Sequence, residues 1–332
     1  MAKIADLLRQ GRTFSFEFFP PKNDVEQATL VRTLRDLEPL APSFVSVTYR
    51  GGSASRQRTH DLVAGMLRTT TLTPMAHLIC VAHTRLELAE ILVGFAKAGV
   101  ENIMALGGDP PADLATGRLA TADSASADSA PAGRPKRGGE LTRAIQLVEL
   151  AQVIGGFSVG VAAHPVGHPR SPDLAADRDH LAEKLAVADF AVTQFFFRAE
   201  EYLGLVGDLA ARGMTKPVVP GIMPITSLSS LPRMAAMGAA VPPEMAERLA
   251  AAGDDSQAVR KAGIEMATEL CDALLVAGAP GLHFYTLNRS TATREIYANL
   301  GLVPPPEPPE EPWPAQTSQP AQPPRPATPD PL

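Results

Sequence analysis

The stretch FSFEFFPPK, residues 14–22, places one carboxylate, Glu17, among four phenylalanines and just before two prolines. Carboxylates are rarely buried without a partner, because the loss of hydration is costly unless the group is protonated or paired. One interpretation is a strand whose Glu17 side chain points into solvent. The other is an acid whose pKa is raised by apolar surroundings, so that it can donate a proton during a reaction.

Other polar residues lie within or directly after short apolar runs. Each of them alone is more often a hydrogen-bonded structural group than a functional one. They are Thr48, His77, Asp109 in ALGGDPP, His164 and His168 in AAHPVGHP, Gln194 in TQFFF, and Tyr285, Asn288 and Arg289 in HFYTLNR.

These residues are carried by eight β-rich runs that alternate with segments of helical periodicity. The runs are 14–19, 43–49, 75–81, 102–106, 157–163, 190–196, 217–223 and 281–287, and the helical segments include 25–40, 84–99, 139–155 and 257–277, with two more helices expected between 227 and 252. The alternation predicts a parallel sheet closed into a (β/α)8 TIM barrel. An open doubly wound sheet is the alternative, although no G-x-G-x-x-G follows any of the runs.

In a (β/α)8 barrel the active site lies at the carboxyl ends of the strands. The polar residues listed above occupy that rim, and their joint position favours a functional role for Glu17, Asp109 and Gln194. His164 and His168 are four residues apart, but the stretch between them contains proline and glycine and is expected to be a loop. A metal site is therefore not favoured.

Composition restricts the class of partner. The 332 residues carry a formal net charge of −6, which argues against nucleic acid and against an anionic membrane surface. Cys80 and Cys271 both lie in apolar segments, which is typical of a reducing compartment. The N-terminus does not resemble a signal peptide and no apolar run is of membrane-spanning length, so we expect a cytoplasmic protein. The oligomeric state is not predicted.

Composition also divides the chain. Residues 1–302 are expected to form one catalytic barrel. Within it, residues 112–139 are rich in Ala, Ser, Asp, Gly and Pro and are expected to form a long mobile loop. Residues 303–332 contain 13 of the 32 prolines of the chain and are expected to be a disordered tail.

Seven blocks, in order, resemble those of the bacterial single-domain 5,10-methylenetetrahydrofolate reductases. They are FSFEFFPPK, FVSVTYRGG followed by RQRTH, AHLICV, GHP, VTQFFF, PGIMPI and GLHFYTLNR. The resemblance covers about residues 12–302 and implies a (β/α)8 barrel. It also implies reduction of 5,10-methylenetetrahydrofolate to 5-methyltetrahydrofolate, in one-carbon and methionine metabolism. The electrons would come from NAD(P)H, with NADH favoured, and usually pass through FAD.

The resemblance also implies roles for individual residues. Glu17 would be the general acid that helps to open the five-membered ring to a 5-iminium cation, and Asp109 would bind the pterin and stabilise that cation. Gln194 would contact folate and the nicotinamide donor, and Arg289 would lie near the dinucleotide. The remaining cofactor contacts would be Thr48, His77, Gly108, Asp109, His164, His168, Asp177 and Lys184.

The flavin positions depart from the family pattern. Gly107 stands where the family has an arginine, Arg137 and Gly138 replace a Tyr-Ala pair, and His164 replaces a tyrosine; His180 and Glu183 replace Asn and Arg. Losing a guanidinium removes charge-assisted donors to an anionic cofactor, and a glutamate adds repulsion. These changes suggest weak or absent FAD binding, with hydride passing directly from NADH to the folate iminium. In the other interpretation, compensating residues restore binding.

Two functions of other classes remain as alternatives. A metal-dependent hydrolase on the same barrel would use His77, His164 and His168 as ligands. A non-catalytic folate-binding or scaffold protein would use the proline-rich tail to recruit partners. Glu17 argues against the second alternative, because binding alone does not require an acid at this position.

Overall fold

The computed structural model describes residues 2–49, 53–81, 83–108, 140–253 and 255–302. The catalytic candidate Asp109, the departures Arg137 and Gly138, and the segments 112–139 and 303–332 lie outside these residues.

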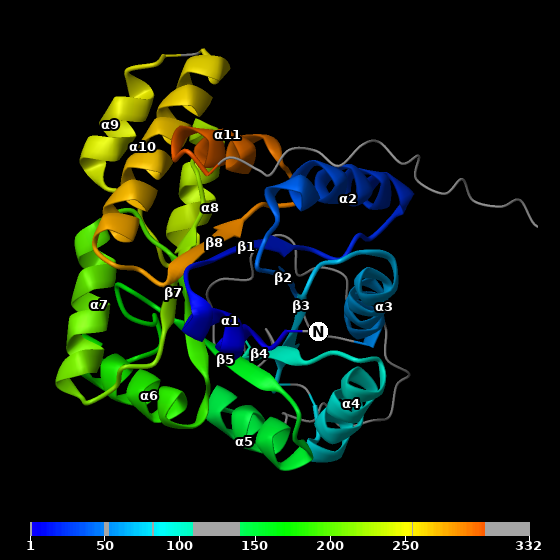
Figure 1. The fold of residues 1–332 in the computed structure, drawn as a ribbon. Helices are drawn as coiled ribbons and strands as arrows, with labels where there is room; N and C mark the ends of the chain where they lie inside the picture. Colours follow the sequence, from blue (N-terminus) through cyan, green and yellow to red (C-terminus); the bar gives the residue numbers. More distant parts are fainter. Residues whose placement is uncertain (1, 50–52, 82, 109–139, 254, 303–332) are drawn as a thin grey trace, which may run out of the picture.

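The described strands form a closed, parallel barrel in sequence order (Figure 1). They are β1 (Thr13–Phe18), β2 (Phe44–Val47), β3 (Pro74–Ile79), β4 (Asn102–Leu106), β5 (Ser158–Ala163), β6 (Phe190–Phe195), β7 (Val218–Ile222) and β8 (Gly281–Tyr285). The barrel closes where β1 pairs with β8, from Thr13 opposite Gly281 to Glu17 opposite Tyr285. The (β/α)8 prediction is confirmed, and the open doubly wound alternative is wrong.

Helices surround the barrel (Figure 1). They are α1 (Ile4–Gln10), α2 (Asp24–Leu37), α3 (Ser53–Thr69), α4 (Arg85–Lys97), α5 (Ala144–Ile154), α6 (Leu174–Val187), α7 (Ala199–Ala211), α8 (Leu231–Ala236), α9 (Pro243–Ala250), α10 (Ser256–Val276) and α11 (Thr291–Asn299). Capping residues in the sequence determine where several of these helices begin. Asn23 caps α2, and Thr84 with Glu87 forms a capping box at α4. The helix expected at 139–155 begins later, at Ala144, and the two helices expected between 227 and 252 are α8 and α9.

The alternation of side chains along β1 separates two apolar cores. Phe16 and Phe18 pack outward with Leu30 and Leu37 of α2. Because successive strand residues point to opposite faces, Glu17 points into the barrel. The lower interior is filled by Phe44, Met75, Met104, Phe190, Val192 and Val219 together with Ile4 and Leu8 of α1.

Helix α1 covers the amino-terminal end of the barrel and lies in front of the strands in Figure 1. The backbone N–H of Ile4 donates to Asn102 Oδ1 at 2.8 Å, and that of Ala5 donates to Ser158 Oγ at 3.1 Å. These contacts close one end, so a site inside the barrel is approached from the carboxyl ends of the strands.

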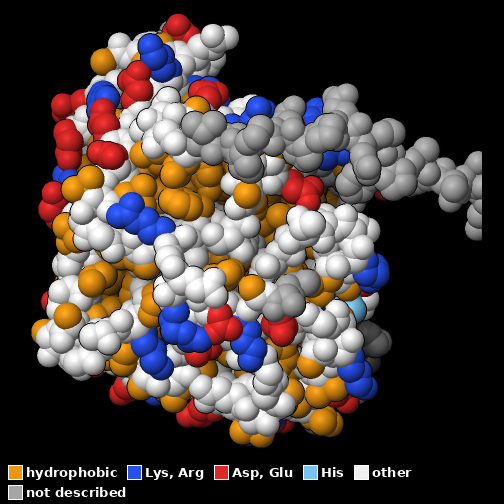
Figure 2. Space-filling view, in the orientation of Figure 1, with side chains coloured by type: hydrophobic (Ala, Val, Ile, Leu, Met, Phe, Trp, Pro, Cys, Tyr) orange, Lys and Arg blue, Asp and Glu red, His pale blue; other side chains and the backbone are white. Residues whose placement is uncertain are grey.

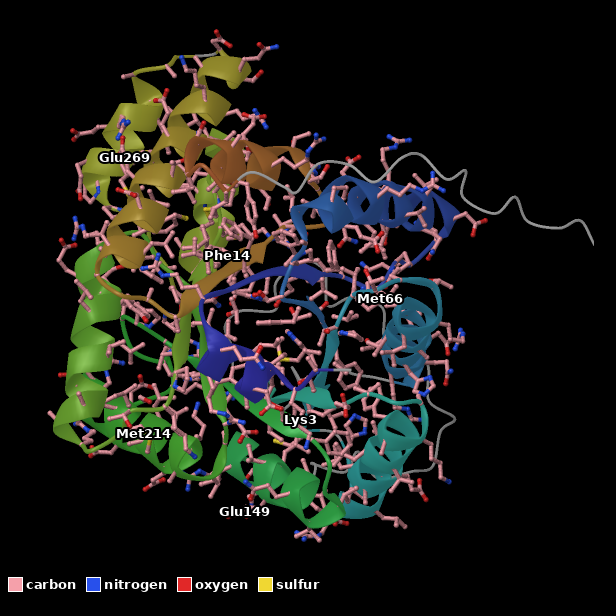
Figure 3. All side chains as sticks on the ribbon, in the orientation of Figure 1. Lys3, Phe14, Met66, Glu149, Met214 and Glu269 are labelled. Carbon is pink, nitrogen blue, oxygen red and sulfur yellow. The ribbon has the colours of Figure 1, made fainter. Side chains whose placement is uncertain are left out.

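The outer surface is charged, with acidic and basic side chains interspersed over the helices (Figure 2). Some of them pair between neighbouring helices, as Arg260 of α10 does with Glu295 of α11 at 2.7 Å. Apolar side chains fill the space between the strands and the helical ring, where Phe14 lies (Figure 3). Among the described residues, no helix is both long and apolar enough to cross a membrane.

Helix α10 approaches the connection after β7 closely at Gly263. A Cβ atom added there would lie 1.7 Å from the carbonyl oxygen of Ile225, which is main chain and cannot rotate away. We therefore expect Gly263→Ala to lower the free energy of unfolding by about 1–3 kcal/mol. Gly204→Ala on α7 is the matched control, because a Cβ there meets nothing within 4 Å. It should be neutral or stabilising, by about 0.5–1 kcal/mol. Urea denaturation measures both changes, and equal effects would contradict the close approach.

Candidate active site

The Glu17 carboxylate lies at the open end of the barrel and is 7% exposed. Ser46 Oγ of β2 donates to its Oε2 at 3.3 Å. His283 Nε2 of β8 and His77 Nε2 of β3 each lie 3.5 Å from the same oxygen. Three strands thus bring polar groups to one carboxylate oxygen, and the interpretation that Glu17 points into solvent is wrong.

The surroundings of Glu17 set its proton affinity. Burial raises the pKa of the carboxyl, but the hydrogen bond from His283, the charges of His77 and His283 and the hydrogen bond from Ser46 outweigh burial, and the pKa lies below its usual value. The expectation of a raised pKa is wrong, because it considered only the apolar neighbours in the sequence and not the serine and histidines that other strands bring to the carboxylate. Burial also lowers the pKa of His77. The site therefore favours the Glu17 carboxylate, with proton-carrying neighbours in contact.

Ser15 and His283 extend this contact deeper into the barrel. Ser15 Oγ lies 2.8 Å from His283 Nδ1. When the Nε2 proton of His283 is directed at Glu17, Ser15 donates to Nδ1 and holds the imidazole ring in that tautomer. The sequence analysis missed Ser15, Ser46 and His283. The signal for two of them was present, since Ser15 and His283 each lie two residues before a rim residue, Glu17 and Tyr285, on the same strand face.

Two predicted cofactor contacts have unsatisfied polar atoms. Thr48 Oγ1 and His77 Nε2 are buried and have no hydrogen-bond partner among the residues described. Buried polar groups are nearly always paired in native proteins. Thr48 directly follows β2, so a bound ligand could supply the partner that its Oγ1 lacks, whereas His77 Nε2 lies within β3 and 3.5 Å from the Glu17 carboxylate.

The remaining rim candidates differ in burial. Gln194 is half-buried and its Oε1 accepts from the backbone N–H of Phe195 at 3.1 Å. The register of β6 against β7 shifts between Val192 and Phe195, so alternation along the strand does not fix the direction of the Gln194 side chain. Arg289 is exposed. Gly108 has a φ of +82°, and a Cβ there would lie 2.4 Å from Val81 Cγ2, so this position requires glycine.

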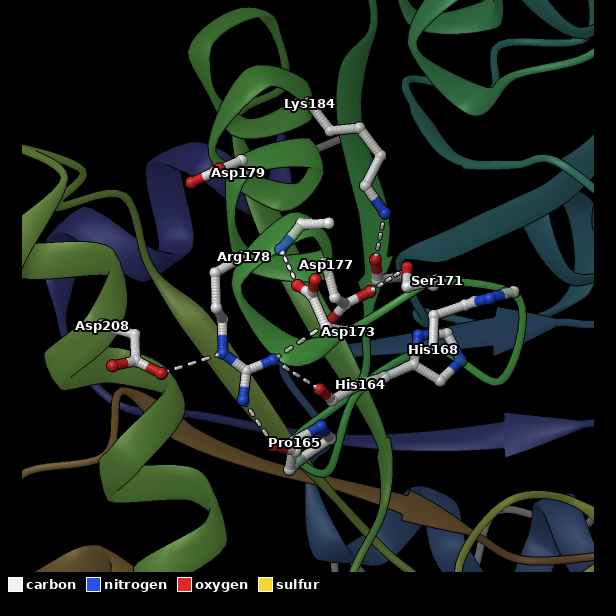
Figure 4. A network of polar contacts seen from close by, with 12 residues as sticks. His164, Pro165, His168, Ser171, Asp173, Asp177, Arg178, Asp179, Lys184 and Asp208 are labelled. Atoms are coloured by element: carbon white, nitrogen blue, oxygen red, sulfur yellow. Dashed lines mark hydrogen bonds and ion pairs between the residues drawn. The ribbon is translucent and has the colours of Figure 1, made fainter.

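A buried arginine organises the connection between β5 and α6 (Figure 4). Arg178 is 2% exposed and donates to the carbonyl oxygens of His164 at 2.9 Å and Pro165 at 2.5 Å. It also pairs with Asp177 at 3.0 Å and with Asp208 of α7 at 3.2 Å. The sequence analysis missed Arg178, because nothing in a helical position marks an arginine as buried. The predicted cofactor contact Asp177 is thus bound to the loop that carries His164 and His168.

The same loop and α6 form a cationic region. Burial, followed by the nearby His168 and Lys184, lowers the pKa of His164 to about 4, and the His164 and His168 rings are in edge contact at 4.6 Å. Burial lowers the pKa of Lys184 to about 8, and its Nζ donates to the Ala162 carbonyl at 2.7 Å. No ion pair to Lys184 occurs in the described part of the chain. The site therefore holds a cation that an anionic ligand would stabilise.

Two departures from the family pattern have different consequences in the structure. Glu183 is exposed and pairs with Arg143 at 3.1 Å, so the repulsion expected from its charge is compensated. Arg170 donates to the Gly108 carbonyl at 3.3 Å and so brings a guanidinium to the end of β4. At Gly107 itself, an added Cβ would meet no atom of the described residues within 4 Å. The missing side chain leaves open space there.

The histidines required by the metal-dependent alternative do not gather. His77 contacts Glu17, whereas His164 and His168 contact each other. Among the described residues, no group of three or more His, Cys, Asp and Glu side chains is placed to hold a metal ion.

Comparisons with known proteins identify the family. Residues 3–301 match the family model for methylenetetrahydrofolate reductase. The chain is 34% identical to the 5,10-methylenetetrahydrofolate reductase of Pectobacterium carotovorum, over 89% of this chain and 92% of that protein. It is 32% identical to the enzyme of the same name from Escherichia coli K12, over 87% and 91%.

A solved structure supports the fold alone. An uncharacterized protein from Clostridium thermocellum, which binds two copies of 5-methyl-5,6,7,8-tetrahydrofolic acid, superposes with a TM-score of 0.56 at 11% identity, over 89% of this chain and 96% of that chain. The sequence matches extend over nearly the whole barrel and carry the assignment. The chain belongs to the methylenetetrahydrofolate reductase family of enzymes.

Proposed function

We propose that this protein reduces 5,10-methylenetetrahydrofolate to 5-methyltetrahydrofolate with NAD(P)H, NADH being the favoured donor, in the cytoplasm. The observation that carries the proposal is the buried Glu17 carboxylate, in contact with Ser46, His77 and His283 at the open end of a barrel of this family. Binding a folate would not require an ionisable group held in this way, whereas opening its ring requires a proton donor.

Glu17 and its neighbours can move that proton. Opening of the five-membered ring transfers a proton to the departing nitrogen and leaves an iminium cation, which accepts hydride at its carbon. Since the pKa of Glu17 is lowered, the carboxylate would take up a proton from the open end of the barrel before each ring opening, while His283, whose other nitrogen is held by Ser15, keeps its own proton and orients the carboxyl. After donation, the hydrogen bonds from Ser46 and His283 stabilise the carboxylate, and its negative charge stabilises the nearby cation.

Other rim residues are proposed to orient the reactants. Gln194, near the carboxyl end of β6, would contact the pterin and the nicotinamide, and Arg289 after β8 would lie near the dinucleotide. Asp109, which lies outside the described residues, keeps its proposed role in binding the pterin. Residues 1–302 are proposed to form the catalytic unit.

The residues around the open end of the barrel support binding of a dinucleotide, and support binding of a flavin only in part. Thr48 has an unsatisfied buried hydroxyl oxygen, and Lys184 would present a cation to a phosphate. A bound flavin supplies two-electron hydride chemistry. Gly107 lacks the guanidinium that the family pattern has on the flavin side. Arg170, from the loop between β5 and α6, brings a positive charge to the same strand end. We propose weak or absent FAD binding, with direct hydride transfer from NADH.

We expect Glu17→Gln to lower kcat by about 10²–10⁴-fold, because the amide keeps the shape of the side chain but cannot deliver a proton. The dissociation constant for the folate product should change little. Steady-state reduction of methylenetetrahydrofolate and equilibrium titration with 5-methyltetrahydrofolate measure the two quantities. The control is Glu269→Gln, because Glu269 is an exposed residue of α10 that pairs with Arg248 of α9. Full activity of Glu17→Gln would exclude the acid role.

We expect the purified protein to contain much less than one flavin per chain and to reduce its substrate with NADH without added FAD. A visible absorption spectrum of the protein as isolated, followed by assays with and without FAD, measures both properties. One bound flavin per chain, together with activity that disappears when the flavin is removed, would contradict direct transfer.

The affinity for NADH should fall as the pH rises through about 8. Lys184 is a cation below its lowered pKa of about 8 and neutral above it, so its attraction for a phosphate is lost at higher pH. Fluorescence titration with NADH between about pH 7 and pH 9 measures the change. Lys184→Met should weaken binding at low pH and flatten the profile. Lys216→Met is the control, because Lys216 donates to the carbonyls of Ala186 and Ala188 and, among the described residues, to no other group. An unchanged profile in Lys184→Met would contradict the assignment.

A further inference from the structure

The turn that follows β8, residues 286–288, binds the end of β1 through side chains. The last backbone pair between the two strands is Glu17 opposite Tyr285. Beyond it, Thr286 Oγ1 donates to the Glu17 carbonyl at 2.6 Å. Asn288 Oδ1 accepts from the Phe19 N–H at 2.8 Å, and Asn288 Nδ2 donates to the Phe19 carbonyl at 2.9 Å. The main chain is thus held at Glu17 and again two residues later.

The carboxamide of Asn288 takes the place of a backbone peptide group. It presents one acceptor and one donor to Phe19, as the next residue of a paired strand would. The strand ladder cannot continue along β1, because Pro20 and Pro21 follow and have no N–H. Asn288 therefore completes the pairing at the last residue that can be paired.

The backbone of this turn is strained. Leu287 and Asn288 have φ angles of +51° and +56°, in the left-handed region. Asparagine tolerates this region, but leucine rarely adopts it. Leu287 is 45% exposed, so its burial does not offset the strain. Residues in such conformations persist where the surrounding structure holds them, and they concentrate at functional sites.

A third contact fixes the turn to the helical ring. Thr33 of α2, 4% exposed, donates from Oγ1 to the Asn288 carbonyl at 2.8 Å. Residues 286–288 are therefore held between α2 and the end of β1, and they cannot move without moving the Glu17 backbone.

We propose that Asn288, assisted by Thr286, is a positioning residue for the Glu17 carboxylate. This inference rests on the proposed function of Glu17. The contacts of Glu17 with Ser46, His77 and His283 are 3.3–3.5 Å long, near the limit for hydrogen bonds, so a small displacement of β1 would break them. Asn288 acts through the main chain and does not contact the reacting atoms.

Asn288→Gly is the sharpest test, because glycine keeps the positive φ without strain and removes only the carboxamide. We expect kcat to fall about tenfold or more, since misplacement of a catalytic group by about 1 Å can cost 10²-fold. The dissociation constant for 5-methyltetrahydrofolate should stay within about threefold, because the folate contacts are not removed. Thr286→Val, which removes the bond to the Glu17 carbonyl, should act in the same direction and serves if Asn288→Gly does not fold.

A second readout does not depend on activity. The groups that face Glu17 are His77, His283, Ser46 and Tyr285, and the histidines and Ser46 lower its pKa. Loosening these contacts should move the pKa of Glu17 upward in Asn288→Gly. Carbon-13 NMR of protein labelled at the glutamate carboxyls, with the Glu17 signal assigned by its loss in Glu17→Gln, measures that titration.

The control is Tyr202→Phe, which removes one buried bond, from Tyr202 to the Val218 carbonyl, on the outer side of the barrel. It should lower the melting temperature but leave kcat and the Glu17 titration unchanged. The proposal is overturned if Asn288→Gly behaves like Tyr202→Phe. A wild-type protein without reductase activity would refute the proposed function, and the Glu17 titration would then still decide whether Asn288 positions the carboxylate.

Discussion

The site depends on the closure of the barrel between its first and last strands. Only this closure brings His283 beside Ser15 and Glu17, which are separated from it by more than 260 residues in the chain. Without His283, His77 and Ser46, Glu17 would be a buried charge without a partner, and such a charge is expensive. The fold and the chemistry are therefore coupled, because the pairing of β1 with β8 that closes the sheet also brings the His283 side chain to the carboxylate.

The open end of the barrel has two electrostatically different sides. On the side of β1, β2, β3 and β8, one carboxylate is surrounded by serine and histidine. On the side of β4, β5 and α6, Lys184 and Arg170 supply positive charge, and Arg178 holds the loop between them through two carbonyl oxygens. This separation of charge supports the proposed transfer of hydride from an anionic dinucleotide to a folate.

The cofactor departures show why a substitution is hard to interpret from its residue type. Glu183 replaces an arginine of the family pattern, but it points outward and pairs with Arg143. Gly107 removes a guanidinium, but Arg170 reaches the same strand end from another loop. The charge at a site depends on which side chains lie close together in space, and the neighbouring residues in the sequence do not reveal this.

The sequence alone determined the barrel, its eight strands and the candidate status of Glu17, because the periods of 2 and 3.6 residues and the family blocks are local signals. It did not determine the direction of the Glu17 pKa. The letters FSFEFF suggested an apolar environment, but strand alternation sends the phenylalanines outward and Glu17 inward. Ser46, His283, Arg178 and the pairing of Asn288 with Phe19 are contacts between distant segments. Only the tertiary structure decided them, because hydrogen bonding and desolvation depend on distances that spacing along the chain does not fix.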